Sequence, residues 1–444
     1  MLLKYIVSNY KSIGHEIEFS MLPTAEDTDE RFISKIQTKQ GEMRVLHRGI
    51  LLGTNASGKS TFIDSIRFAK DLITNERRSG RMIPLTQFRG CFMDLKALST
   101  FQFLLYLNGE VYDYGFTVSS AMIREEWLMQ LDTDGFHTVF ERETDTHSKT
   151  QIHMTDRLAE KDSNQRKLAE ILASGMQQNQ RNQLFLYRLY DNSISSILPV
   201  FEWFDKIQVI FPNSQINNFE RAVSAYQDFS KDLSAFLSGA DTGIKEVILE
   251  KQDQDIETLL KQIGVPDNLV QKLYQTKHGT LKLGNRFFSF NEENGELKLI
   301  EVKFQHILNG KEYTFEKSEE SDGTQRLLDL FPILYENHRR QPHTYFIDEL
   351  DRSLHTALTT KILDNFIQDA ASSSSQIILT AHDVNLLDFR HFSQSEFWFF
   401  EKTEKGETKI NPFSNFDIAN KGYDVVRAYL SGRFGAVPYF KEEF

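Results

Sequence analysis

Cysteine is almost absent from this chain of 444 residues. Cys91 is the only one, so no disulfide can form within the chain and no zinc site can be built from several cysteines. Positive charge is also scarce, because 51 Lys and Arg residues stand against 63 Asp and Glu, a net charge of −12. This balance disfavours attraction of the whole molecule to nucleic acid or to an anionic membrane, and leaves room only for a local basic groove.

Long apolar runs and targeting segments are missing as well. The longest apolar runs, such as residues 103–107, fall far short of the roughly 20 residues that a membrane span needs. The first ten residues reach polar positions too soon for a signal peptide. With only 23 Gly and 9 Pro, the chain has little material for flexible linkers. We therefore expect a cytoplasmic, membrane-free protein of two or three domains, or one α/β domain with an insertion.

The sequence does contain a phosphate-binding loop. Residues 53–60 read G-T-N-A-S-G-K-S and fit the pattern G-x-x-x-x-G-K-[ST]. An apolar strand at 45–52 precedes the loop, and apolar residues at helical spacing over 62–73 follow it. In such a loop the backbone N–H groups converge on phosphate oxygens, Lys59 reaches the β- and γ-phosphates and Ser60 binds Mg²⁺. The alternative is a glycine-rich turn that merely caps a helix, and the strand-loop-helix context disfavours it.

Two further apolar strands end in polar residues. The strand 344–347 runs into Asp348 and Glu349, which predicts a carboxylate for the Mg²⁺ shell and a base that activates the attacking water. The strand 377–380 is followed by Ala381 and His382, a candidate sensor of the γ-phosphate. Because ligands of open α/β sheets sit at the carboxyl ends of the strands, we expect these residues to lie near the phosphate loop. An ordinary helix cap and a solvated histidine are the alternatives.

A helix start supplies a fourth element. Ser321, Asp322 and Gly323 precede an apolar helix over 327–335, and together they would expose a hydroxyl and backbone N–H groups to an anion. The alternative is a plain capped helix.

Along the chain the four elements occur in the order phosphate loop, S-D-G helix start, strand ending at Asp348 and Glu349, and strand ending at His382. In this order they resemble the ABC-type ATPase heads of the SMC, DNA-repair and OLD (overcoming lysogenization defect) nuclease clade, in particular the AAA-family ATP-binding proteins of abortive-infection and phage-defence operons. The resemblance extends to N-Y-K-S at 9–12, Y-D-Y-G-F at 112–116, E-E-W-L at 125–128, F-E-R-E at 140–143 and R-F-G-A-V-P at 433–438. Asp322 stands where the family signature has glycine.

The resemblance implies a set of site residues. The residues implied to bind nucleotide are Lys11, Asn55, Ala56, Ser57, Gly58, Lys59, Ser60, Thr61, Ser321, Asp322 and Gly323. Ser60 and Asp348 are the implied metal ligands, and Glu349 and His382 are the implied catalytic residues.

The implied fold is an α/β P-loop head: a mixed sheet flanked by helices, an antiparallel β subdomain and a helical insertion. We expect an N-terminal lobe at 1–150, the insertion at 151–278 and a C-terminal lobe at 279–444. Composition also predicts a loop at 21–43 and mostly helix over 215–275.

The implied function is an ATP- and Mg²⁺-dependent switch that oligomerises head to tail around ATP. Because too few residues follow His382 for a second enzyme, we expect it to control a separately encoded effector, a Toprim or H-N-H nuclease, in an anti-phage system with a phage-derived trigger. The alternative is a DNA-binding repair or recombination ATPase, and a GTP-specific or small-molecule switch is a weaker third. The net negative charge and the lack of a heptad pattern favour the switch that controls a separate effector.

Overall fold

The computed structural model describes most of the chain in two compact units. The described residues are 1–25, 27–90, 98–161, 163–212, 228–252, 278–283, 286–293, 296–339, 342–416 and 424–435. Unit 1 comprises residues 1–212, 340–350 and 366–444, and unit 2 comprises 213–339 and 351–365. Residues 151–212 therefore pack with the N-terminal part of the chain, whereas the division expected from the sequence begins a new segment at 151. That three-part division stays a prediction.

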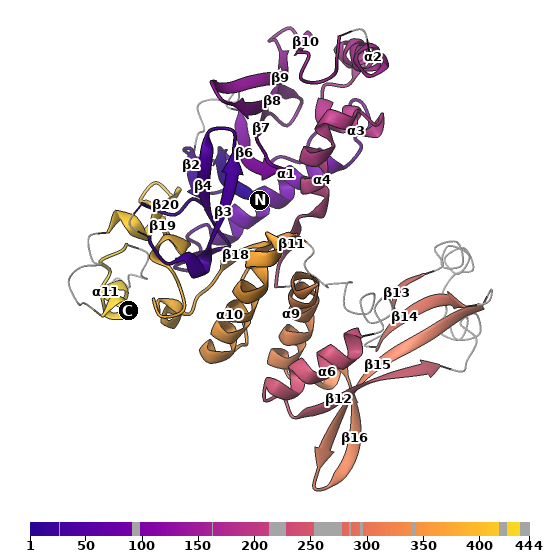
Figure 1. Cartoon of the computed structure of the whole chain (residues 1–444), viewed down its shortest axis with the longest axis vertical. Helices are drawn as coiled ribbons and strands as arrows, with labels where there is room; N and C mark the ends of the chain where they lie inside the picture. Colours follow the sequence, from indigo (N-terminus) through magenta and orange to yellow (C-terminus); the bar gives the residue numbers. More distant parts are fainter. Residues whose placement is uncertain are drawn as a thin grey trace. The chain divides into compact units, whose positions relative to one another are not determined.

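Unit 1 contains a six-stranded sheet, four of whose strands, β11, β18, β19 and β20, are labelled in Figure 1. Its order is β11-β17-β18-β5-β19-β20, and all neighbours are parallel except the last pair. Its strands are β5 (Arg48–Gly53), β11 (Gln208–Ile210), β17 (Thr344–Ile347), β18 (Gln376–Thr380), β19 (Phe397–Lys402) and β20 (Thr408–Pro412). Every residue of the two central strands β5 and β18 is buried, as expected where both faces of a parallel sheet are covered. The carboxyl ends of β5, β17 and β18 therefore meet at one edge.

A seven-stranded antiparallel sheet and a hairpin complete the β structure of unit 1. The sheet order is β10-β9-β8-β7-β6-β1-β2. Its strands are β1 (Leu2–Ser8), β2 (Ile17–Ser20), β6 (Ser99–Leu107), β7 (Glu110–Val118), β8 (Ile123–Asp132), β9 (Gly135–Thr144) and β10 (Thr150–Met154), and the hairpin is β3 (Ile33–Thr38) with β4 (Gly41–Leu46). Asn108 and Gly109 have φ angles of 52° and 88°, which fits the tight turn that their sequence predicts between β6 and β7.

Helix α1 (Lys59–Thr74) packs against both sheets of unit 1. The ring of Phe62 lies 5.4 Å from those of Tyr5 and Phe19 in the antiparallel sheet, and 5.6 Å from that of Phe400 in the parallel one. The other helices of this unit are α2 (Asn164–Asn179), α3 (Phe185–Asp191), α4 (Leu198–Lys206), α11 (Val425–Leu430) and the second half of α10 (Thr356–Ser373). Burial of these aromatic rings fixes α1, and with it the loop at its start, on the sheet.

Unit 2 is an antiparallel sheet with helices. Its described helices and strands are α6 (Phe229–Gly239), β12 (Ile244–Gln252), β13 (His278–Leu283), β14 (Arg286–Glu293), β15 (Glu296–Leu308), β16 (Lys311–Glu316), α9 (Asp322–His338) and the start of α10. The long strand β15 pairs with β12, β14 and β16. Phe229 of α6 packs 5.0 Å from Phe331 and 4.9 Å from Tyr335 of α9, so α6 and α9 share an aromatic core.

Two expectations about local structure are wrong. Residues 33–38 and 41–46 pair as a hairpin, so residues 33–43 of the segment 21–43 that we expected to be a loop are mostly strand. Residues 244–252 form β12 within the segment 215–275 that we expected to be helical, because β-branched Ile and Val residues pair there with β15. The remainder of that segment, at 215–227 and 253–275, lies outside the described residues, as does the end of the predicted tail at 436–438.

No helix among the described segments combines the length and the hydropathy that a membrane crossing requires.

Candidate functional site

The phosphate loop joins β5 to α1, and its conformation explains the glycine at position 58. Gly58 precedes the first helical residue with a φ of 109°, a region that L side chains rarely adopt. A Cβ atom built there would lie 2.0 Å from Oγ1 of Thr408 on β20. Gly58 also has no side chain to cap the helix. The capping residue therefore makes no side-chain hydrogen bond at the start of α1, and an anion suits this end because the helix dipole is positive there.

The other residues of the loop differ in exposure. Asn55 and Ala56 are exposed, and Ala56 is held in the left-handed region with a φ of 62°. Thr61 is half-buried. The hydroxyl of Ser57 is buried and has no hydrogen-bond partner in the part of the chain that the structure describes. A buried hydroxyl in this state costs about 1–3 kcal/mol, so the loop carries polar capacity that its own contacts leave unused.

Lys59 is folded back over the loop. Its Nζ atom donates to the carbonyl oxygens of Gly53 at 2.6 Å and Thr54 at 3.0 Å. The side chain is buried, which places a cation within the loop and against two neutral acceptors. A phosphate would offer this ammonium group charged acceptors, and charge-assisted hydrogen bonds are about twice as strong as neutral ones.

Ser60, Asp348 and Thr380 meet at the carboxyl edge of the parallel sheet. The Ser60 hydroxyl donates to Oδ1 of Asp348 at 3.1 Å, and the Thr380 hydroxyl donates to the same oxygen at 2.7 Å. Asp348 is buried directly after β17, and its N–H group donates to the carbonyl of Ile210 on the neighbouring strand. The strands thus bring together two predicted metal ligands that are 288 residues apart in the sequence.

These oxygens fit a Mg²⁺ ion. In an octahedral site with Mg–O distances of about 2.0–2.1 Å, neighbouring ligand oxygens lie about 2.9 Å apart, close to the separation of the Ser60 and Asp348 oxygens. Among the described residues, no group of three or more His, Cys, Asp or Glu side chains could hold a metal ion. Mg²⁺ usually takes one or two protein oxygens and completes its shell with water and substrate phosphates.

Glu349 and His382 face each other beside this pair. Glu349 follows β17 with a φ of 49°, a strained conformation for a residue other than glycine. Its N–H group donates to the Thr380 hydroxyl at 2.7 Å, which anchors the strained peptide. Nε2 of His382 lies 3.8 Å from Oε1 of Glu349, and 43% and 34% of the two side chains are exposed. A carboxylate open to solvent beside a phosphate loop can accept a proton from water.

The S-D-G element belongs to unit 2. Ser321 is the N-cap of α9, and its Oγ accepts a hydrogen bond from the N–H group of Thr324 at 3.2 Å. Asp322 is the first helical residue, where its negative charge suits the helix dipole. A Cβ atom at Gly323 would lie 2.8 Å from the carbonyl oxygen of Ser353, so a glycine is needed there.

Lys11 is engaged elsewhere. Its Nζ atom lies 2.5 Å from Oδ2 of Asp64 on α1, and the hydroxyl of Tyr10 donates to the same carboxylate at 2.6 Å. Burial alone would raise the pKa of Asp64, but the hydrogen bonds from Lys11, Tyr10 and Arg67 outweigh it and hold that pKa below its ordinary value. The structure thus pairs Lys11 with Asp64, and a role in nucleotide binding stays a prediction.

Sequence reasoning missed two residues that support the site. Thr380 joins Asp348 to Glu349, and the only sequence signal for it is its place at the end of an apolar strand. Thr408 lies directly against the loop at Gly58, and its hydroxyl forms a hydrogen bond with the Ser12 hydroxyl at 2.9 Å. No sequence pattern connects Thr408 with residues so distant along the chain.

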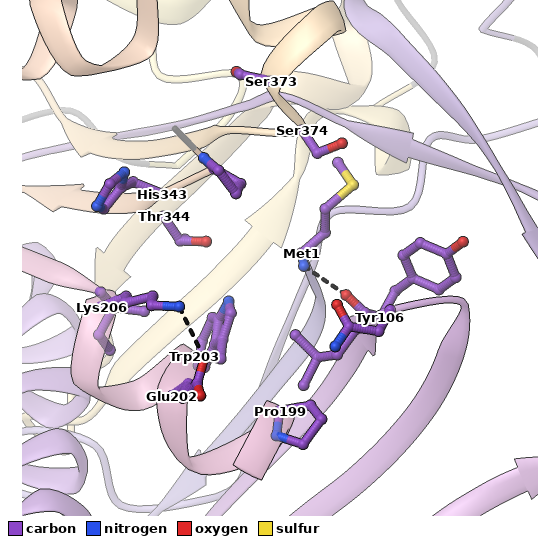
Figure 2. Close-up of a pocket in the computed structure, with 14 residues that line it drawn as sticks. Met1, Tyr106, Pro199, Glu202, Trp203, Lys206, His343, Thr344, Ser373 and Ser374 are labelled. Carbon is purple, nitrogen blue, oxygen red and sulfur yellow. Dashed lines mark hydrogen bonds and ion pairs between the residues drawn. The ribbon is translucent and has the colours of Figure 1, made fainter. Parts of the chain in front are cut away.

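A separate cavity of about 310 Å³ opens at the other edge of the same sheet (Figure 2). Thr344, which lines it, begins β17 and pairs with Gln376 at the start of β18, so the cavity lies at the amino ends of the strands. Glu202 and Lys206 of α4 also line it and are paired with each other at 2.9 Å. The cavity is therefore not part of the candidate site.

One protein family matches most of the chain. Its model, described as "AAA domain, putative AbiEii toxin, Type IV TA system", matches residues 50–388. The chain belongs to this AAA family. Membership confirms the predicted AAA family of the abortive-infection kind, and the parallel sheet with its helices and the antiparallel sheet confirm the predicted α/β fold class. The matched region contains every predicted site residue of the AAA domain except Lys11. No curated protein matches the sequence.

Solved SMC heads also resemble this AAA protein, at low identity. The SMC head domain from Thermotoga maritima matches with 13% identity and a TM-score of 0.35, over 93% of this chain and 98% of that one. An SMC head bound to the C-winged helix domain of ScpA matches with 10% identity and a TM-score of 0.41, over 92% and 97%. A head domain with an extended coiled coil, bound to the C-terminal domain of ScpA derived from Pyrococcus furiosus, has 12% identity and a TM-score of 0.37, over 92% and 95%.

Proposed function

We propose that the protein is an ATP-hydrolysing switch that assembles head to tail around ATP and controls a separately encoded effector. The observation that carries the proposal is the meeting of Lys59, Ser60, Asp348 and Glu349 at one edge of the parallel sheet of unit 1. A cationic loop, a hydroxyl-carboxylate pair and a solvent-accessible base are the parts that phosphoryl transfer to water requires.

In this proposal the residues divide the work. The N–H groups at the start of α1 and Lys59 bind the phosphates. Ser60 and Asp348 would hold Mg²⁺, which neutralises charge on the transferring phosphoryl group when bound. Glu349 accepts the proton of the attacking water, and His382, 3.8 Å away, orients that carboxylate and contacts the γ-phosphate. The Thr380 hydroxyl keeps Asp348 and the backbone of Glu349 in place.

We further propose that the S-D-G element of one chain completes the ATP site of a second chain. The N–H groups at the start of α9 and the Ser321 hydroxyl form an anion-binding end on unit 2, where the charge of an opposing γ-phosphate would be stabilised. ATP then holds two chains together, and hydrolysis releases them, because the contacts to the γ-phosphate exist only in the ATP state.

The biological part of the proposal is anti-phage defence. It is supported by the family description, which names a toxin of a toxin–antitoxin system of the abortive-infection type. The proposed partner is a nuclease of the Toprim or H-N-H type, whose activity changes with the nucleotide state of the ATPase.

Mixing two inactive variants tests the composite site. Lys59→Ala removes the cation that faces the phosphates, and Ser321→Arg places a bulky cation at the proposed contact with the second chain. Each alone should lose ATP hydrolysis, and their mixture should recover part of it through one intact composite site. Lys70→Ala on the same helix is the control for loss of a lysine from α1. No recovery of ATP hydrolysis in mixed assemblies, confirmed by co-purification of two differently tagged variants, would refute the composite site.

Affinity purification with the native operon tests the effector. The protein, purified in ATP and Mg²⁺ and followed by mass spectrometry, should retain a nuclease, and Lys59→Ala should change the amount retained. Recovery of the ATPase alone, together with DNA cleavage by the purified chain, would overturn this part of the proposal.

A further inference from the structure

A side-chain hydrogen bond ties the start of α9 to the sheet of unit 2. Nε2 of His306 on β15 lies 2.7 Å from Oε1 of Glu320, the residue that precedes the S-D-G element. Only 15% of the His306 side chain and 6% of the Glu320 side chain are exposed. Hydrogen bonds to a carboxylate are stronger than neutral ones, and one shielded from water is less screened.

His306 is itself held by the sheet. Its cross-strand neighbours are Ile244 on β12 and Tyr313 on β16, so β15 is paired on both sides at this point. Its ring packs edge-on to that of Phe315, with centroids 4.9 Å apart and an interplanar angle of 80°. The imidazole is therefore a fixed point whose position follows the sheet.

Glu320 connects His306 to the S-D-G element. Its backbone carbonyl accepts a hydrogen bond from Nε2 of Gln325 at 2.8 Å, one turn into α9. The next residue, Ser321, caps the helix, and Gly323 lies against the carbonyl of Ser353 with no space for a side chain. We therefore expect a displacement of Glu320 to move the helix start, because Gln325 is bonded to Glu320 and the capping Ser321 follows it directly.

We propose that His306 is a positioning residue for the S-D-G element, and that through it the sheet β12–β16 sets the geometry in which this element meets ATP bound to a second chain. The inference rests on the proposed composite site and adds its regulation: a change in the β15–β16 hairpin alters ATP hydrolysis by moving the start of α9. His306 touches neither nucleotide nor the phosphate loop in this scheme.

The first test separates kcat from KM for ATP. His306→Ala should lower kcat by about 10- to 100-fold, the range expected when a reacting group is displaced by about 1 Å, and leave KM within about twofold. His306→Gln keeps an N–H donor in reach of Glu320 and should recover most of kcat. Ile307→Ala, at an exposed neighbouring position on β15, is the matched control and should behave as wild type. A wild-type kcat for a folded His306→Ala protein would overturn the proposal.

Mixing experiments locate the defect. A chain carrying His306→Ala has an intact phosphate loop, and Lys59→Ala has an intact S-D-G element, so their mixture should regain activity through one complete site. Lys59→Ala is mixed with either Ser321→Arg or His306→Ala. If ATP hydrolysis recovers in the mixture with Ser321→Arg but not in the one with His306→Ala, the positioning role alone is overturned. If it recovers in neither mixture, the composite site is overturned. If His306→Ala does not fold, the two single variants Glu320→Gln and His306→Gln are compared instead. Glu320→Gln weakens the same contact and should lower kcat without changing KM, and wild-type kcat in that variant would equally refute the role.

Discussion

Substituting alanine for Gly58 tests whether the phosphate loop has the backbone that phosphate binding needs. The φ of 109° is unfavourable for alanine, at a cost of about 1–3 kcal/mol. A Cβ atom would also lie 2.0 Å from Oγ1 and 2.7 Å from Cγ2 of Thr408. Thr408 is buried and bonded to Ser12 through both its hydroxyl and its N–H group, so it cannot turn away freely. Overpacking of this kind costs about a further 1–3 kcal/mol.

Gly41 provides a matched control for the backbone strain. Its φ is 119°, and a Cβ atom there would meet nothing within 4 Å. We therefore expect Gly41→Ala to lose about 1–3 kcal/mol of unfolding free energy from strain alone and to bind nucleotide like wild type. Gly58→Ala should lose about 2–6 kcal/mol unless the loop shifts. A shift that relieves as little as 1.4 kcal/mol at the expense of the phosphate contacts would weaken nucleotide binding about tenfold.

The assays are urea denaturation and titration with a fluorescent ATP analogue. Thr408→Ala, combined with Gly58→Ala, removes the two nearest atoms and leaves Cβ at 2.8 Å, so it should restore part of the stability and little of the affinity. The reasoning is refuted if Gly58→Ala and Gly41→Ala are equally stable and bind the nucleotide equally well.

Three further perturbations address the base, a buried ion pair and pH. Glu349→Gln should keep ATP binding and slow hydrolysis by about 10²–10⁴-fold, because base catalysis is worth that much, and wild-type turnover would exclude Glu349 as the base. Glu396→Ala should lower the unfolding free energy by about 3–5 kcal/mol, because it leaves the fully buried Arg48 guanidinium, 2.8 Å from Glu396, without its counter-charge. Replacing both residues by apolar ones should recover much of this loss, as denaturation assays would show. Burial lowers the pKa of the His47 imidazole below its ordinary value of 6.5, although the hydrogen bond to the carbonyl of Ser375 opposes this shift. As the pH falls below 6.5, His47 therefore takes up a proton more readily in the unfolded chain than in the folded one. Stability should therefore fall as pH drops below 6.5, and the fall should be smaller in His47→Gln, as pH-dependent denaturation would show.

The sequence was most informative where the chemistry is local. The pattern of residues 53–60 fixes a glycine at the turn, a lysine at the first helical position and a serine after it, and the structure has the strand, loop and helix that this pattern predicts. Asp348 and His382 could be placed because apolar runs of four or five residues identify buried parallel strands, whose ends must meet at one edge.

The failures have one physical cause, which is pairing with distant segments. Residues 244–252 have a composition that is compatible with a helix, and hydrogen bonding to β15 more than 40 residues later decides for a strand. The hairpin 33–46 is polar enough to be a loop when read alone. It is ordered because one side of it is buried, with Ile33, Ile36 and Val45 in the core of unit 1.

Thr380 shows why a site cannot be completed from its motifs. One hydroxyl donates to the Asp348 carboxylate and accepts from the Glu349 N–H group, both at 2.7 Å, so a single side chain holds the proposed metal ligand and the strained backbone of the proposed base. This contact helps to hold the strained backbone of Glu349 in place. A valine at position 380 would fit the apolar strand equally well in a sequence pattern and would remove both bonds. A single hydroxyl oxygen thus distinguishes Thr380 from an ordinary strand residue. Its two contacts follow from the register between β17 and β18, which the sequence does not give.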